Sequence, residues 1–422
     1  MGPVPLAEFS TPRRNPWVEG KISEGVFGQD NGSMEAIAAG GMHTLLIDER
    51  GTVRSCGVND DAALGRATES VPNPAQEGSY LDEGELESYP HPVQTLQENN
   101  FRAVKVAAGD CISAAVSSDG ELYIWGTFKA SEGTLGFSEK ARHQQVPQRI
   151  QLGPTTTRTQ ANPEKAVAIA AGNNHLLILS THGSVYSCGA GESGELGHKI
   201  PSRLKLHGTK VYKIALGRRA NRARCVGAGK SCSFAVDENG DVWGWGLNCF
   251  GQTGTGISSP KTLSDEIHIP TKVPKLSAEA LNGDVVVQIA GGAHHTLFLT
   301  SQGKVYACGR CDGGELGLSD DNEEFAQRRD PRFLDQPLQV SIPEQDEDPI
   351  VQISAGIENS MAVTRDGALY AWGQETNGEL GVKGVNAKTP TVVVRRTGGS
   401  WQAKAVACGG HHSLGLFRRK AD

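Results

Sequence analysis

Glycine recurs at fixed intervals along this chain, and this recurrence limits the possible folds more than any other feature. A second glycine follows the first after eleven residues, a third after seventeen, and a Leu-Gly pair ends after twenty-five. In the second copy alone, the last glycine comes two residues late. Constant spacing within each copy, with connectors of variable length, indicates a structural repeat. Its seven copies begin at Gly40, Gly109, Gly172, Gly229, Gly292, Gly356 and Gly409.

Each copy has the pattern of short strands joined by tight turns. In the third copy, Val167–Gly172 and His175–Leu179 are short apolar runs, and Ser184–Cys188 alternates as a third strand. We expect Gly183, in the turn before that third strand, to have a positive φ, which glycine adopts without a Cβ clash. A more variable fourth strand follows a proline, as in Pro147–Ile150.

These units predict an all-β fold, because four antiparallel strands repeated about seven times cannot extend as one flat sheet. Packed face to face around an axis, they form a seven-bladed β-propeller with six full four-stranded blades and an incomplete seventh. The seventh copy ends after its second strand. One ring then accounts for residues 1–422 as a single domain, with repeat cores near 36–66, 103–137, 166–198, 224–256, 286–318, 351–382 and 404–417.

Composition excludes several other classes of protein. With 41 Lys and Arg against 48 Asp and Glu, the chain is not a uniformly basic nucleic-acid coat. No apolar run approaches the roughly 18 residues of a membrane span. Gly229-Lys230-Ser231 resembles the end of a phosphate loop, but Arg224 stands where that loop requires glycine. Cys308 and Cys311 lack a second cysteine pair, so we expect no metal and no cofactor.

The repeat resembles that of the regulator of chromosome condensation family. It shares the Gly-x-x-His opening, the turn glycine, Val-Tyr-x-Trp-Gly and Gly-x-Leu-Gly over nearly the whole chain, and it lacks the Trp-Asp signature of another propeller family. Two stretches are particularly similar to the family's founding exchange factor for the GTPase Ran: the first is 40–45 followed by 56–66, and the second is 119–136.

The resemblance implies a function. A member of this type releases GDP from Ran by stabilising the nucleotide-free GTPase, without covalent chemistry, as a nuclear monomer docked on nucleosomes or DNA. The alternative is a chromatin-binding or ubiquitin-pathway propeller scaffold that has no exchange activity.

The resemblance also assigns site residues. Asp110 and His294 match residues that the family uses to accelerate exchange. A protruding β-wedge of the family falls on Phe128, Lys129, Ala130, Ser131, Glu132, Gly133, Thr134 and Leu135, for which an ordinary long loop is the alternative. The other expected GTPase-binding residues are His43, Glu139, Asn174, His198, His411 and His412.

Several of these positions depart from the family or allow a structural reading. Asn174 replaces a family aspartate, and His198 stands where animal members have arginine. Four histidines recur three residues after a repeat glycine, which favours a hydrogen bond between blades over four separate roles: His43, His175, His295 and His412. For His43 both readings remain open.

Residues 199–224 carry nine Lys or Arg and no acidic residue. This segment is either a solvated loop or an arm for histones or DNA phosphate. The resemblance favours the arm, with chromatin contacts from Arg203, Lys205, Lys210, Lys213, Arg218 and Arg219.

The N-terminus differs from the family pattern. Family members begin with a basic tail and with strands that finish the last blade, whereas Met1 is followed almost directly by Pro12–Pro16. We therefore expect a shortened N-terminus, an open edge on the seventh blade and no visible import signal.

Overall fold

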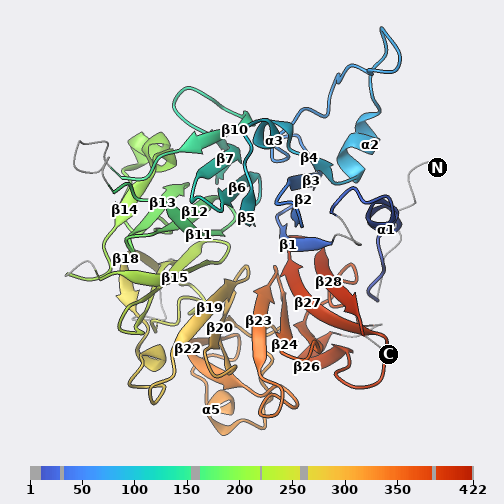
Figure 1. Cartoon of the computed structure of the whole chain (residues 1–422). Coiled ribbons are helices and arrows are strands. Elements are labelled where there is room, and N and C mark those ends of the chain that lie inside the picture. The colour runs from blue at the N-terminus through green and yellow to red at the C-terminus, as the bar shows by residue number, and fades with distance from the viewer. Residues whose placement is uncertain are drawn as a thin grey trace.

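Six four-stranded antiparallel sheets stand around a common centre, as predicted (Figure 1). The computed structural model describes residues 11–28, 33–153, 162–218, 221–256, 265–382 and 386–420. The first strands of neighbouring sheets contact one another, which shows that the first strand of each sheet lies innermost. The later strands follow outward in chain order. This arrangement is an all-β propeller.

The first three sheets contain Met34–Ala39 (β1), His43–Asp48 (β2), Val53–Gly57 (β3), His91–Pro92 (β4); Ala103–Ala108 (β5), Ile112–Ser117 (β6), Leu122–Gly126 (β7), Gln144–Ile150 (β10); and Ala166–Ala171 (β11), His175–Ser180 (β12), Val185–Gly189 (β13), Tyr212–Ile214 (β14). The next three contain Ala223–Ala228 (β15), Cys232–Asp237 (β16), Val242–Leu247 (β17), Glu266–Lys272 (β18); Val286–Gly291 (β19), His295–Thr300 (β20), Val305–Arg310 (β21), Phe333–Val340 (β22); and Ile350–Ala355 (β23), Asn359–Thr364 (β24), Leu369–Gly373 (β25), Ala387–Val394 (β26).

The helices that the structure describes are short; the first precedes β1, and the others lie in the connections between strands. They are Pro16–Ser23 (α1), Glu83–Ser88 (α2), Gln94–Glu98 (α3) and Glu323–Ala326 (α5), with 3₁₀ turns Ser202–Thr209 (η1) and Pro274–Leu276 (η2). Among the described residues, no helix has the length and apolar character needed to cross a bilayer.

The residue composition and burial of a strand depend on how far the strand lies from the axis. The innermost strands crowd together and are rich in alanine, as in β11, whereas every residue of the second strand β12 is buried. The core lies between neighbouring sheets: Leu45 and Val53 of the first sheet pack with Trp125 of the second. Gly183 has φ +73°, as predicted for its turn.

The ring closes through a two-stranded sheet, Trp401–Cys408 (β27) with Ser413–Arg419 (β28). This sheet contacts β23 and β24 on one side and β1 on the other, so the first and last parts of the chain lie side by side (Figure 1). The Gly410 N–H donates to the Gly40 carbonyl at 3.0 Å. Leu416 of β28 packs against a cluster of Phe27, Met34 and Leu46, so the segment before β1 shares a core with this sheet.

Histidines do join neighbouring sheets, as their recurrence predicted. The Nε2 atoms of His43, His175 and His295 lie 2.8–2.9 Å from serine hydroxyls of the following sheet. Nε2 of His412 lies 3.1 Å from the Thr44 hydroxyl, across the closure of the ring. The repeated histidine is therefore a structural link between sheets.

Candidate functional site

Seven short junctions, each between the first and second strands of a sheet, surround the axis at one end of the propeller. In six of them, the second residue's N–H donates to a carbonyl of the next junction, at 2.7–3.3 Å. This backbone ring fixes the positions of the side chains that follow. A cavity of about 370 Å³ opens within it, lined by residues of all seven junctions.

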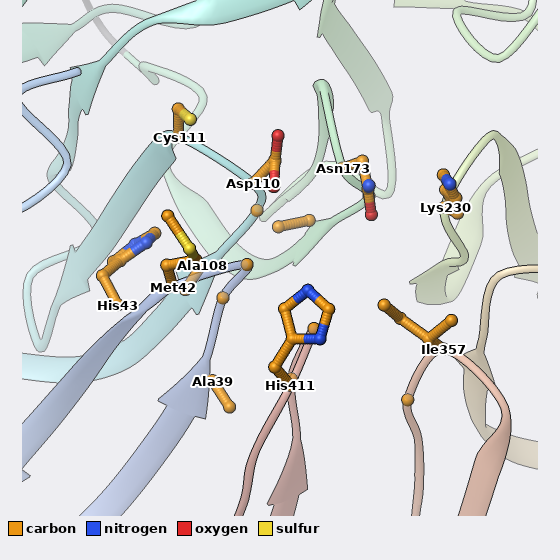
Figure 2. Close-up of a pocket in the computed structure, with 18 of the residues that line it drawn as sticks. Ala39, Met42, His43, Ala108, Asp110, Cys111, Asn173, Lys230, Ile357 and His411 are labelled. Atoms are coloured by element: carbon orange, nitrogen blue, oxygen red, sulfur yellow. The ribbon is translucent and has the colours of Figure 1, made fainter. Parts of the chain in front are cut away.

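Asp110 lies at the second junction and faces this cavity (Figure 2). Its N–H donates to the Asn173 carbonyl at 2.7 Å, which holds the backbone. Its carboxylate lies over Gly41 of the first sheet, in space where a Cβ would clash. No hydrogen bond or ion pair to this carboxylate comes from the described residues. The backbone of Asp110 is therefore held in place, while its carboxylate has no bonding partner among the described residues and could meet one from outside.

His294 lies at the fifth junction, on the same end of the propeller, with no direct hydrogen bond to Asp110. Its ring packs against Phe250, with centroids 5.0 Å apart, and Phe250 packs in turn against Phe333. Burial lowers the pKa of His294, and the nearby Lys230 lowers it further. The ring is therefore neutral at pH 7. Its buried Nδ1 has no hydrogen-bond partner among the described residues.

Residues 128–136 form a hairpin of two paired strands, Phe128–Ala130 (β8) and Gly133–Gly136 (β9), and not an ordinary loop. The buried Phe128 ring stacks on Phe137 and anchors its base. At the other end, the Glu132 side chain is 82% exposed. The hairpin thus presents a polar tip on a buried aromatic base.

Two neighbouring loops hold the backbone of this hairpin. The Asn174 side-chain oxygen accepts from the Lys129 N–H at 3.0 Å. Glu192 accepts from the N–H and the hydroxyl of Ser131, at 2.6 and 3.1 Å. Lys205 lies 3.1 Å from Glu192 and 3.3 Å from Glu132. In this structure Asn174 therefore supports the hairpin, a contact that an amide makes as well as an aspartate would.

A third support comes from the first sheet. Lys129 Nζ lies 2.8 Å from Asp61, and the Cys111 thiol donates to the same carboxylate at 3.2 Å. Burial raises the pKa of Cys111 to about 12, so it remains a thiol at neutral pH. For Lys129, burial acts to lower the pKa, but the hydrogen bonds to Asp61 and Cys111 outweigh it and raise the pKa. The Lys129–Asp61 pair is therefore ionised.

The remaining expected GTPase-binding residues lie in different environments. His411 is exposed and lines the cavity (Figure 2). His43 is only 2% exposed and lies 2.8 Å from the Ser113 hydroxyl, yet it is among the residues that line the cavity, so its contact with a partner stays a prediction. His412 is committed to Thr44. His198 Nδ1 lies 3.0 Å from the Leu196 carbonyl, and its ring packs on Tyr212.

Several lysines of the basic segment lie beside acidic residues, whereas its chromatin contacts stay a prediction. Lys205 pairs with the hairpin, as described above, and Lys210 lies 2.7 Å from Glu139. Lys213 lies 3.7 Å from Glu164. Arg203 and Arg218 are exposed; Arg219 lies outside the described residues. Lys205 and Lys210, in the middle of the basic segment, thus neutralise acidic residues in and beside the hairpin.

Sequence reasoning missed four supports of this end of the molecule: Gly41, Asp61, Glu192 and Phe250. The Gly40-Gly41 doublet was the only local signal, since it removes a side chain beside Asp110. The other three act on residues of neighbouring sheets, and no spacing along the chain reveals such pairs.

Comparisons with known proteins agree with the propeller fold. The RCC1-like domain family matches residues 3–415. Protein pim1 of Schizosaccharomyces pombe is 32% identical, over 98% of this chain and 71% of that protein. The guanine nucleotide exchange factor SRM1 of Saccharomyces cerevisiae is 31% identical, over 98% and 84%. A crystal structure of Prp20p from the same yeast, described with its binding to Gsp1p and histones, matches with TM-score 0.79 and 28% identity, over 98% of this chain and 86% of that one.

Proposed function

The chain belongs to the RCC1-like domain family, and from this premise we propose that it is a guanine nucleotide exchange factor for a Ran-type small GTPase. It releases GDP by stabilising the nucleotide-free GTPase and makes no covalent bond to it. The relatives of known name support this activity, since SRM1 is an exchange factor and Prp20p binds Gsp1p. The second candidate, a scaffold without exchange activity, leaves the free carboxylate of Asp110 unexplained.

One observation carries the proposal: an unpaired carboxylate at the centre of a stiff end, beside a supported hairpin. Asp110 keeps its charge free, while its backbone is bound into the junction ring. The hairpin 128–136 is held from three loops and projects Glu132 into solvent. A GTPase docked on this end would meet a fixed anion and a rigid wedge at the same time.

The energetics require such rigidity. A nucleotide bound at picomolar affinity has about 16 kcal/mol of binding free energy. The exchange factor must bind the empty GTPase tightly enough to offset that, and the coupling is reciprocal, so incoming nucleotide expels the factor. A preorganised surface loses little conformational freedom on binding, and more of its contact energy then opposes nucleotide binding. In the proposal, the hairpin pushes on the nucleotide site while Asp110 and His294 hold the GTPase.

The finer architecture and the location are also part of the proposal. We take β27 and β28 as the seventh blade, of which two strands are present, within a single propeller domain whose repeat cores are those expected from the glycine spacing. Prp20p binds histones, which supports a nuclear, chromatin-docked location for this chain as a monomer.

A direct test is formation of a complex with the empty GTPase. The purified chain and Ran, stripped of nucleotide with a chelator, should elute together on size exclusion, and added GDP should separate them. A scaffold without exchange activity would bind equally in the presence and absence of GDP, or not at all. Either result would contradict the proposal.

A further inference from the structure

Two opposite charges stand at equivalent places in the ring of junctions. The second residues of the seven junctions all line the cavity; in chain order they are Gly41, Asp110, Asn173, Lys230, Ala293, Ile357 and Gly410. Only Asp110 and Lys230 among them carry a charge. The ring therefore presents one anion, already part of the proposed exchange site, and one cation.

Backbone hydrogen bonds fix these two residues relative to each other. The Asp110 N–H donates to the Asn173 carbonyl at 2.7 Å, and the Asn173 N–H donates to the Lys230 carbonyl at 3.1 Å. The Lys230 N–H in turn donates to the Gly292 carbonyl at 2.9 Å. Asn173 thus stands between the two charged residues (Figure 2). The ring therefore sets the spacing at which a partner meets the anion and the cation.

The ammonium group of Lys230 is unpaired. The side chain is exposed, and within the part of the chain that the structure describes it forms neither a hydrogen bond nor an ion pair, with Asp110 or with any other residue. By contrast, Lys129 of the hairpin lies 2.8 Å from Asp61, and Lys205 lies 3.1 Å from Glu192. Lys230 is therefore a cation that this end of the molecule leaves open to a partner.

The charged groups beside Lys230 do not cancel it. Lys230 lies near His294, because it lowers the pKa of that ring after burial, and Arg310 lowers the same pKa further. Glu358 acts on His294 in the opposite direction, but its carboxylate is bound by Arg310 at 3.0 Å. This side of the ring thus keeps a cation next to a neutral imidazole, whereas the side of Asp110 keeps an anion.

We propose that Lys230 is a specificity-determining residue that binds an Asp or Glu carboxylate on the surface of the GTPase. This rests on the proposed function and deepens it, since it names a feature that the GTPase must have. A partner must present an acidic side chain to Lys230 and a basic one to Asp110, at the spacing that the ring sets. Complementary charges select partners in this way, because like charges that meet at an interface are strongly disfavoured.

The other anion in such a complex is the phosphate of the bound nucleotide. A lysine that bound this phosphate would stabilise the complex of factor, GTPase and nucleotide together. Coupling between binding sites is reciprocal, so that contact would hold the nucleotide and oppose its release. A contact with a side chain of the GTPase remains after the nucleotide has left, and it therefore agrees with stabilisation of the empty GTPase.

The test measures GDP release from increasing concentrations of Ran, with catalytic amounts of the full chain. Lys230→Glu should raise the half-saturating concentration of Ran at least about tenfold and leave the maximal rate within about twofold, because the contact is present before and after release. Lys230→Arg should behave as the unmodified chain does. The measurement is made at pH 8, well above the ordinary histidine pKa of 6.5, so that the change does not act through the charge of His294.

Affinity for the nucleotide-free GTPase separates a carboxylate from a phosphate. Lys230→Glu should bind Ran stripped of nucleotide at least about tenfold more weakly than the unmodified chain does. A loss of affinity seen only with GDP present would assign Lys230 to the phosphate and would overturn the proposal.

A matched control makes the same change of charge away from the cavity. Lys404 is exposed in β27, four residues before Cys408, which lines the cavity. Four residues of strand span about 13 Å. Lys404→Glu should leave the half-saturating concentration and the maximal rate within about twofold of the unmodified chain. Equal effects of Lys404→Glu and Lys230→Glu would reduce the effect to net charge and would overturn the proposal.

A charge exchange with the GTPase completes the test. In a set of Ran variants, each with one surface Asp or Glu changed to Lys, one variant should respond poorly to the unmodified chain and recover at least about threefold with Lys230→Glu, as in a double-mutant cycle. If no variant recovers while the unmodified chain releases GDP, the proposal for Lys230 fails and the exchange function stands. If the unmodified chain releases no GDP, the exchange function fails, and this inference fails with it.

Discussion

The carboxylate of Asp110 occupies the space directly over Gly41 of the neighbouring sheet, where any larger residue would place its Cβ. The two residues are 69 positions apart in the sequence, yet a Cβ at position 41 would clash with the carboxylate at position 110. The absence of a side chain at position 41 thus lets the charge at position 110 lie over the mouth of the cavity.

Gly41→Ala should therefore slow nucleotide exchange by displacing Asp110. We expect GDP release from Ran to fall at least fivefold, or about 1 kcal/mol, as measured by loss of labelled GDP. The control is Gly20→Ala, since a Cβ at position 20 of α1 meets no atom within 4 Å. Equal rates for Gly41→Ala and the unmodified chain would show that the position of the carboxylate is unimportant.

Asp110→Ala should slow GDP release at least about tenfold, which corresponds to roughly 1.4 kcal/mol. Because no described residue bonds this carboxylate, its removal leaves no buried group unpaired, and the melting temperature should change little. Parallel exchange and thermal-unfolding measurements separate the two effects. An unchanged exchange rate would remove Asp110 from the site.

Glu192→Ala should loosen the hairpin, because it removes both acceptors of Ser131 and the partner of Lys205. These contacts are partly exposed, so we expect a local loss of about 1 kcal/mol. Trypsin cleavage after Lys129 should accelerate, and GDP release should slow several-fold. Glu192→Gln, which keeps one acceptor oxygen, should lie between the two.

The matched control for this change is Glu238→Ala, in an exposed turn of the fourth sheet on the opposite end. It removes the same charge and should alter neither cleavage nor exchange. If Glu192→Ala changed neither cleavage nor exchange, the hairpin would be rigid without the contacts of Glu192 to Ser131 and Lys205.

His295→Asn should make stability less dependent on pH. Burial lowers the pKa of His295 to about 3, against an ordinary value of 6.5. Its contribution is therefore complete above pH 6.5 and is lost as the pH falls from 6.5 towards 3, because only the unfolded chain takes up the proton. Glu195, whose pKa burial raises to about 7, acts in the opposite direction but equally in both proteins.

Asparagine is the matched substitution, because Asn359 occupies the corresponding position of the next sheet and lies 3.4 Å from Ser413. Thermal unfolding between pH 7 and pH 4 should show a smaller decrease in melting temperature for the variant. A parallel decrease in the two proteins would indicate that His295 is protonated in the folded state or that its burial carries no cost.

The architecture could be predicted because its determinants are local and repeat. Gly183 needs its positive φ within a single turn, and His175 reaches the next sheet from the same position in every copy that has it. Within the candidate site, the sequence could predict only the place of a single residue in its repeat, such as Asp110 at the second junction, and the role of that residue stays a prediction. Asn174 and Glu192 support a hairpin from a different sheet, and Lys205 pairs across the same gap, so their roles depend on which loops meet in space.

The most direct measurement of the central claim is the rate of GDP loss from Ran with catalytic amounts of the purified chain. The proposed function predicts acceleration that grows with the amount of chain added, proceeds with either GDP or GTP in excess, and falls at least about tenfold with Asp110→Ala. GDP loss at the spontaneous rate, with the propeller folded and monomeric, would contradict it.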